Sequence, residues 1–159
     1  MTLILGGHTK HYKYTKENIQ KIYSKLNNNI NKKNLQLVVI PSIRTPSGTI
    51  KLAKEYFGSD HLIIDNVDKK AYLSALSLAK FIVVMCDSSS MISEAALTGK
   101  PIYIAQIPSS KNDYRFKKFR DLFKELNIIK ELNDNLETWN YERLDETNRV
   151  AQEIKKKLI

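Results

Sequence analysis

Short apolar runs alternate with longer amphipathic segments along the whole chain, and this alternation restricts the folds the chain can adopt. The segments between the runs carry apolar residues at helical spacing. Strands that alternate with helices are typical of βαβ units and a parallel sheet. We therefore predict one α/β domain over residues 1–159, with a Rossmann-like, doubly wound, mostly parallel six-stranded sheet and helices on both faces. The predicted strands are residues 2–5, 35–40, 61–64, 81–86, 102–105 and 128–129.

Capping residues predict where several helices begin and end. The first helix is expected to start at Thr15 and to end in the polar segment 27–33. The second is expected to use Thr45 as its cap, with Pro46 in the first helical position, and to end at Gly58.

Apolar stripes predict the inner faces of the later helices. A helix over residues 69–80 precedes the fourth strand, and the last helix is expected over residues 145–158. We expect the helix between the fifth and sixth strands to pack through Phe116, Phe119, Phe123 and Leu126. The last helix is expected to pack through Val150, Ile154 and Leu158.

Composition limits the class of protein only loosely. The formal charge of +9 favours anionic partners: nucleotide phosphates, acidic lipid surfaces or nucleic acid. The lysines are scattered, and no zinc finger, helix-turn-helix or aromatic ribonucleoprotein motif is present, so we do not expect nucleic-acid binding. The single Cys86 cannot form an internal disulfide, and no cationic residue stands beside it, so we expect an inert core thiol. With no signal-peptide pattern and no long apolar stretch, we expect a cytoplasmic protein.

The segment after the fourth predicted strand carries the strongest functional signal. Asp87, Ser88, Ser89 and Ser90 follow an apolar run and open a short helix that ends near Gly99. Free backbone N–H groups at a helix start favour phosphate or another anion. Glu94 stands one turn further on, where its carboxylate can accept hydrogen bonds from sugar hydroxyls. A well-capped structural helix is the alternative interpretation of this segment.

Other loops at the same edge of the sheet add candidate ligands. Gly6 and Gly7 end the first strand and allow close approach of the backbone to a phosphate, to which Lys10 adds charge. This loop matches neither the dinucleotide fingerprint nor the Walker A motif. In the most common doubly wound order, the first and fourth strands are neighbours at the point where ligands bind. We therefore expect these glycines to lie close to the serines.

The loops after the second and third strands are also candidates. Ser42 and Arg44 follow the second strand, and an arginine can hold phosphate through two parallel hydrogen bonds. Asp65 and Asn66 follow the third strand and can contact a base or ribose, or simply cap the next helix.

Metal and hydrolase sites are not expected. His8 and His11 are three residues apart but have no third ligand nearby in the sequence, so no metal site is predicted. The serines lack a Gly-x-Ser-x-Gly elbow, and no histidine follows them.

Several motifs together resemble a known family. They are residues 5–12 (LGGHTKHY), 42–46 (SIRTP), 87–95 (DSSSMISEA), 99–101 (GKP), 115–116 (RF) and 141–147 (YERLDET). This set is similar to the mitochondrial fission "elongated mitochondria" family, whose bacterial members are often labelled nucleoside-diphosphate-sugar epimerase. That family in turn resembles the GT-B glycosyltransferases and the UDP-N-acetylglucosamine 2-epimerases.

The resemblance implies a GT-B C-terminal-type domain that binds a nucleotide sugar, with a UDP-sugar expected as the ligand and no separate cofactor. It places the diphosphate near Gly6, Gly7 and the serines at 88–90, ribose near Glu94, and the base near Asp65 and Asn66. Family members carry an additional N-terminal half that this sequence lacks. Activity as a glycosyltransferase or epimerase is therefore not expected of this chain alone.

The resemblance also leaves a second function open. Plant members act in membrane division as adaptors, which implies a non-catalytic interaction module. The partners to be expected are a sugar nucleotide, a separate chain that supplies the N-terminal half or a second copy, and an anionic membrane surface contacted peripherally.

Overall fold

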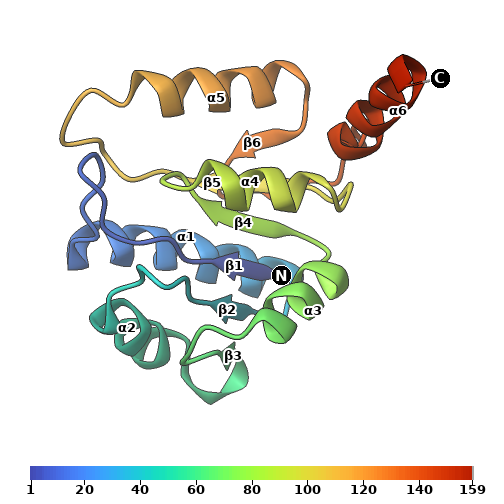
Figure 1. Ribbon diagram of the computed structural model, residues 1–159. Coiled ribbons are helices and arrows are strands. Elements are labelled where there is room, and N and C mark those ends of the chain that lie inside the picture. The colour runs from blue at the N-terminus through green and yellow to red at the C-terminus, as the bar shows by residue number, and fades with distance from the viewer. Residues whose placement is uncertain (159) are drawn as a thin grey trace.

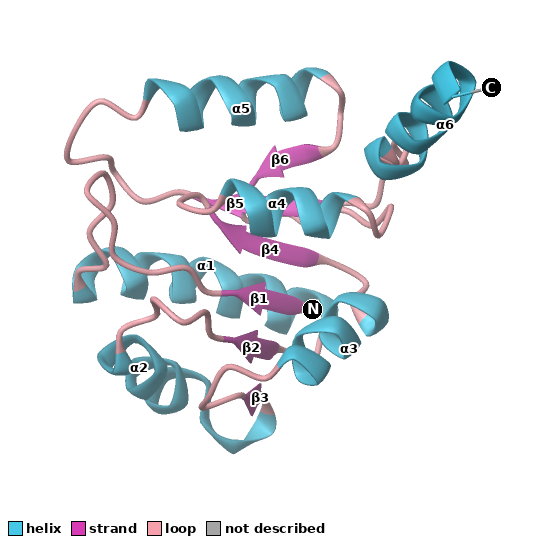
Figure 2. Ribbon diagram, in the orientation of Figure 1, coloured by secondary structure: helices cyan, strands magenta, loops and turns pink. Residues whose placement is uncertain are grey.

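A six-stranded, wholly parallel sheet organises the chain in the computed structural model, which describes residues 1–158 (Figures 1 and 2). The strand order is β3-β2-β1-β4-β5-β6, so the winding reverses between β1 and β4. The strands are β1 (Thr2–Ile4), β2 (Val38–Ile40), β3 (Leu62–Ile63), β4 (Ile82–Met85), β5 (Ile102–Ala105) and β6 (Ile129–Glu131). The predicted fold class is confirmed, and every predicted strand is present: β5 has the predicted bounds, and the other five differ slightly from theirs.

Helices cover both faces of the sheet. They are α1 (Lys16–Lys33), α2 (Ser47–Phe57), α3 (Lys69–Leu78), α4 (Ser89–Ala96), α5 (Tyr114–Glu125) and α6 (Glu146–Leu158), with a short 3₁₀ turn, η1 (Gly58–Asp60). In Figure 1, α4 passes in front of the sheet and α1 passes behind it. The inner strands β1, β4 and β5 are buried along their whole length, as expected when helices cover both faces of a parallel sheet.

The first helix is longer than its sequence predicts. Thr15 caps it as expected, with its side chain accepting from the Asn18 N–H, but α1 continues through residues 27–33 and ends at Asn34. The buried Asn29 explains the difference, because its side-chain amide donates to the Lys25 carbonyl and to the Asn133 carbonyl, at 3.0 and 2.8 Å. Tertiary contacts therefore stabilise a segment of low helix propensity.

The second helix begins differently from its prediction. Pro46 is the N-cap of α2 and makes no side-chain capping bond. Thr45 instead donates its hydroxyl to the Gly6 carbonyl at 2.6 Å, which joins the loop after β2 to the loop after β1. Gly58 ends the helix as predicted.

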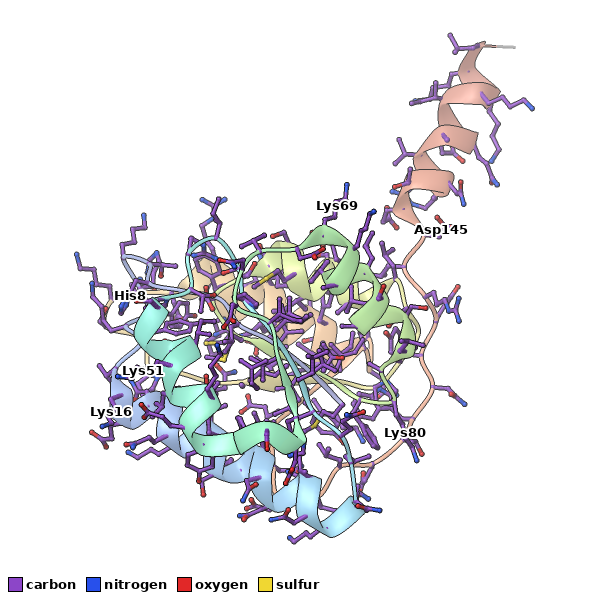
Figure 3. All side chains as sticks on the ribbon, turned by 90° about the horizontal axis from the view of Figure 1, so that it is seen from below. His8, Lys16, Lys51, Lys69, Lys80 and Asp145 are labelled. Carbon is purple, nitrogen blue, oxygen red and sulfur yellow. The ribbon has the colours of Figure 1, made fainter. Side chains whose placement is uncertain are left out.

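Two packing predictions need correction. In α5, Phe123 is buried and the buried Arg120 shares the inner face, whereas Leu126 is the C-cap beyond the helix and is half exposed. In α6, none of the residues is buried, and Val150, Ile154 and Leu158 are all exposed. Figure 3, where Asp145 marks the residue before α6, shows this helix projecting away from the rest of the molecule.

Candidate functional site

The loops that follow β1 and β4 meet at the carboxyl edge of the sheet. β1 pairs directly with β4, with Ile4 opposite Val84. Beyond the strands, the Gly7 N–H donates to the Asp87 carboxylate at 3.1 Å. The predicted convergence of these two loops is confirmed, and it arises because the sheet winding reverses between these strands.

Asp87 is the centre of this junction. Its side chain has no exposed surface, and it accepts the Tyr14 hydroxyl proton in a 2.5 Å hydrogen bond. The Arg44 guanidinium lies 3.1 Å from its other carboxylate oxygen. Burial, followed by the nearby Asp87 charge, raises the pKa of Tyr14 far above its usual range, so this phenol stays protonated. The Asp87 side chain thus links the loop after β4 to the loops after β1 and β2, and both of its carboxylate oxygens are bonded to protein groups.

Gly6 and Gly7 are required by close packing at this junction. A Cβ atom on Gly6 would lie 2.0 Å from the Asp87 Oδ1 atom, and one on Gly7 would lie 1.9 Å from the Arg44 carbonyl oxygen. Both distances are too short for non-bonded atoms. The sequence predicted a close approach of this backbone to a ligand, and the structure shows a close approach to the protein's own groups.

The start of α4 presents free donors beside this junction. Ser88 is its N-cap, and its hydroxyl accepts from the Met91 N–H at 3.4 Å and lies 3.3 Å from the Ser90 hydroxyl. Within residues 1–158, the backbone N–H groups of Ser89 and Ser90 have no hydrogen-bond acceptor. Unpaired N–H groups and the helix dipole together favour an anion at this end of α4.

Two cationic side chains flank the same edge. The side chain of Arg44 is 40% exposed, so part of the guanidinium remains accessible beside its bond to Asp87. Lys10 is exposed on the loop after β1 and forms no ion pair within the described residues. Ser42, by contrast, bonds within its own turn: its N–H donates to the Thr45 hydroxyl at 2.8 Å, and its hydroxyl lies 3.1 Å from the same oxygen.

Glu94 lies on the side of α4 that faces α3. Its exposed carboxylate accepts the Tyr72 hydroxyl proton at 2.8 Å. Burial, and then this carboxylate, raise the pKa of Tyr72 above its usual range. Glu94 also lines a groove of about 420 Å³ between α3 and α4, together with Leu73, Leu76, Ser77, Leu97, Thr98 and Lys100. A polar ligand can therefore reach Glu94 from solvent.

Asp65 and Asn66 stand apart from the other candidates. Both are exposed in the loop after β3, and Asp65 forms an ion pair with Lys54 at 2.5 Å. β3 is separated from β4 by β2 and β1, which is three strand spacings, or about 14 Å. The structure therefore does not bring these two residues together with the start of α4.

The two histidines and the cysteine have separate surroundings. His8 accepts the Tyr14 N–H at its Nδ1 atom, whereas His11 packs its ring edge-on against Phe116. Among residues 1–158, no three His, Cys, Asp or Glu side chains are grouped so that they could hold a metal ion. Cys86 is buried, and burial raises its pKa to about 11, so its thiol is protonated at neutral pH.

Sequence reasoning missed the residues that hold the site together. Tyr14, Thr45 and Tyr72 each bond a candidate residue, namely Asp87, Gly6 and Glu94. Aromatic and threonine side chains in loops and helices give no sequence signal for such distant partners. Only the topology, which places their elements side by side, makes these contacts predictable.

Solved structures with a similar fold include UDP-N-acetylglucosamine 2-epimerases. A structure described as S. aureus MnaA with UDP aligns with a TM-score of 0.59 and 16% identity, covering 96% of this chain and 36% of the other. The Methanocaldococcus jannaschii UDP-GlcNAc 2-epimerase, solved with UDP-GlcNAc and UDP, aligns with a TM-score of 0.52 and 18% identity, covering 98% and 44%. At these identities, the similarity establishes the Rossmann-like fold alone.

Sequence relatives identify the family. An uncharacterized protein, RP120, from Rickettsia prowazekii is 32% identical over 96% of this chain and 45% of its own length. The mitochondrial fission protein ELM1 of Arabidopsis thaliana is 26% identical over 74% of this chain and 28% of its own length. The chain thus spans less than half the length of these two relatives. The family model described as mitochondrial fission ELM1 matches residues 1–158, and the chain therefore belongs to this family.

Proposed function

We propose that this chain binds a nucleoside diphosphate sugar at the carboxyl edge of the sheet, with the diphosphate at the start of α4. The observation that carries the proposal is the free N–H groups of Ser89 and Ser90, which lie beside the loop after β1 and the partly exposed Arg44. An anion there gains both backbone donors and a favourable helix dipole. The solved structures of similar fold, two of which contain UDP, support this choice of ligand.

Glu94 extends the proposed site away from the diphosphate. From the groove between α3 and α4 its carboxylate can accept hydrogen bonds from ribose hydroxyls, beside its bond from Tyr72. Asp65 and Asn66 then face the base. The glycosyl group is expected on the opposite side of α4, toward α5. In this proposal the chain supplies a binding surface for the nucleotide sugar.

Isothermal titration calorimetry with UDP and UDP-N-acetylglucosamine tests the proposal, with ADP, GDP and CDP for comparison. The informative variant is Ser90→Asp, because a carboxylate in the first turn stabilises the helix yet repels a phosphate. We expect at least tenfold weaker binding of UDP. Ser24→Asp introduces the same charge on an exposed position of α1 and should leave the affinity unchanged. Glu94→Gln should also weaken binding, since it removes the charged acceptor for the ribose.

Two results would contradict the proposal. If no nucleoside diphosphate produces heat at millimolar concentration, the nucleotide site is absent. If UDP binds but Ser90→Asp binds it as tightly as the unchanged chain does, the diphosphate does not lie at α4.

A second candidate function is a non-catalytic interaction module, and α6 favours it. Val150, Ile154 and Leu158 form an exposed apolar stripe on a helix that also carries Lys155, Lys156 and Lys157. Among the described residues, no helix is both long and apolar enough to span a membrane. Co-sedimentation with vesicles containing anionic lipid, at low and high salt, tests peripheral attachment through this helix.

A further inference from the structure

A large cleft lies next to the start of α4, on the side away from Glu94. The loop after β1 reaches across to the loop before α5, where Tyr12 pairs with Ser109, and Figure 1 shows these two loops side by side. The cleft between them has a volume of about 710 Å³, within the range of sites that bury most of a small organic ligand. It is lined by Lys10, His11, Ser89, Asn112, Asp113, Tyr114, Arg115, Phe116 and Phe119.

One wall of this cleft is fixed by a buried polar network. Tyr12 donates its hydroxyl proton to the Asp113 carboxylate at 2.5 Å, and Arg120 lies 3.2 Å from that carboxylate. Arg120 also donates to the Tyr12 hydroxyl and to the Cys86 carbonyl, at 2.9 and 3.0 Å. The hydrogen bond from Tyr12, aided by Arg120, holds the pKa of Asp113 below its usual range. This network fixes α5 against the loop after β1, and Arg120 balances the one carboxylate in the cleft lining.

The remaining charge in the cleft is positive. Lys10 and Arg115 are both exposed, and neither forms an ion pair with any acidic residue within the described part of the chain. The Tyr114 N–H at the start of α5 is taken up by the Asn112 side chain at 2.9 Å, but the next two N–H groups, of Arg115 and Phe116, have no acceptor within the described residues. Two cations and a helix start together favour an anionic group in this space.

The cleft also offers flat apolar surface. Phe116 and Phe119 are half-buried on α5, and Tyr114 is mostly exposed beside them. A ring of a ligand can pack one face on these aromatic side chains while its polar edge meets the cations. A small inorganic anion would leave most of the volume and the aromatic surface unused.

We propose that this cleft binds an acidic sugar: a ring that packs on Phe116 and carries a carboxylate or phosphate held by Arg115 and Lys10. The proposal rests on the proposed function, because Ser89 belongs to both the cleft and the diphosphate site. A diphosphate at α4 therefore has its glycosyl group at the mouth of the cleft. The substrate class that follows is a nucleotide sugar with an acidic group on the sugar.

The direct test compares UDP-glucuronic acid with UDP-glucose by calorimetry, since the two probes differ only in a carboxylate against a hydroxymethyl group. We expect the chain to bind UDP-glucuronic acid at least tenfold more tightly. Arg115→Gln should reduce this preference to less than threefold while leaving the affinity for UDP-glucose unchanged. Lys118→Gln removes an exposed cation of the same helix that does not line the cleft, and it should keep the preference.

Failure of this inference is distinguishable from failure of the proposed function. Equal affinity for the two UDP-sugars overturns the acidic subsite and leaves the nucleotide site standing. If neither binds, glucuronate and glucose 6-phosphate are titrated against glucose, and backbone amide shifts at Tyr114, Arg115 and Phe116 are followed by NMR. Shifts with either acid that are absent with glucose and lost in Arg115→Gln support the cleft and identify its anion as carboxylate or phosphate. If no such shifts appear, the cleft does not bind an acidic sugar and the inference is overturned.

Discussion

Gly7 is tightly packed whereas Gly48 has open space around it, and this contrast gives a prediction at the scale of single residues. A Cβ atom on Gly7 would meet the Arg44 backbone, whereas one on Gly48, in the first turn of α2, would meet nothing within 4 Å. We expect Gly7→Ala to lower the free energy of unfolding by about 1–3 kcal/mol, since the backbone must shift. Gly48→Ala should raise it by up to about 1 kcal/mol, because alanine loses less entropy in a helix.

Urea denaturation of both variants measures these changes. Gly48→Ala serves as the control for the general effect of adding a methyl group to a glycine. If both substitutions change the stability in the same direction, the close approach of Gly7 to the loop after β2 does not constrain this position.

The candidate residues divide into those that sequence reasoning places well and those it does not. The serines at 88–90 follow a buried strand and open a helix, and this local pattern alone predicts their free N–H groups. Asp87 has the same local context, yet it is turned inward by Tyr14 and Arg44, which are distant in the sequence. Local sequence therefore predicts what the backbone does here, while the direction of a side chain depends on distant partners.

At the scale of elements, α6 is the helix least connected to the molecule. Its apolar stripe of Val150, Ile154 and Leu158 packs on nothing among the described residues. We expect the triple replacement of this stripe by Gln to change the free energy of unfolding by less than about 0.5 kcal/mol, as exposed substitutions do. By contrast, Phe123→Ala in α5 removes a buried side chain and should cost about 3–5 kcal/mol.

Chemical denaturation of the two variants tests this difference. A large loss from the α6 replacement would show that the stripe is covered in solution, by a second copy or by another part of the chain. The measurement is therefore repeated over a range of protein concentrations, because self-association makes the apparent stability depend on concentration.

Helix extent illustrates the limit of prediction at this scale. The end of α2 at Gly58 follows from local chemistry and is correctly predicted. The end of α1 is not, because the Asn29 amide finds a partner at Asn133, more than a hundred residues further on. The stripe of α6 has the periodicity of a packed helix, but periodicity does not specify which surface covers it.

At the scale of the whole molecule, the parallel sheet and its order were predictable, since alternating strands and helices leave few arrangements. The same architecture buries polar aromatic groups between its layers. Burial is the largest cause of a raised pKa at Tyr12, Tyr14, Tyr23 and Tyr72, and it also raises the pKa of Cys86 to about 11. These groups keep their protons in the folded chain at pH values where the unfolded chain loses them.

The pH dependence of stability follows from this difference. A group whose folded pKa is raised contributes stability that is fully present below its unfolded pKa, about 9 for the thiol and 10 for the phenols, and that is lost as the pH rises beyond it. Each such group lowers the free energy of unfolding by about 1.4 kcal/mol per pH unit in that range. We therefore expect stability to fall steeply between pH 9 and 11.

Tyr23→Phe isolates one of these groups. Tyr23 donates its hydroxyl proton to the Thr49 carbonyl at 3.0 Å, so at pH 7 the variant should lose about 1 kcal/mol with that hydrogen bond. At pH 11 the loss should shrink or change sign, because the unchanged chain must keep a phenol protonated and the variant need not. Urea midpoints at pH 7, 9, 10 and 11 measure how steeply stability falls with pH in the unchanged chain and in the variant. Parallel slopes would mean that Tyr23 ionises equally in the folded and unfolded states, which contradicts its burial between α1 and α2.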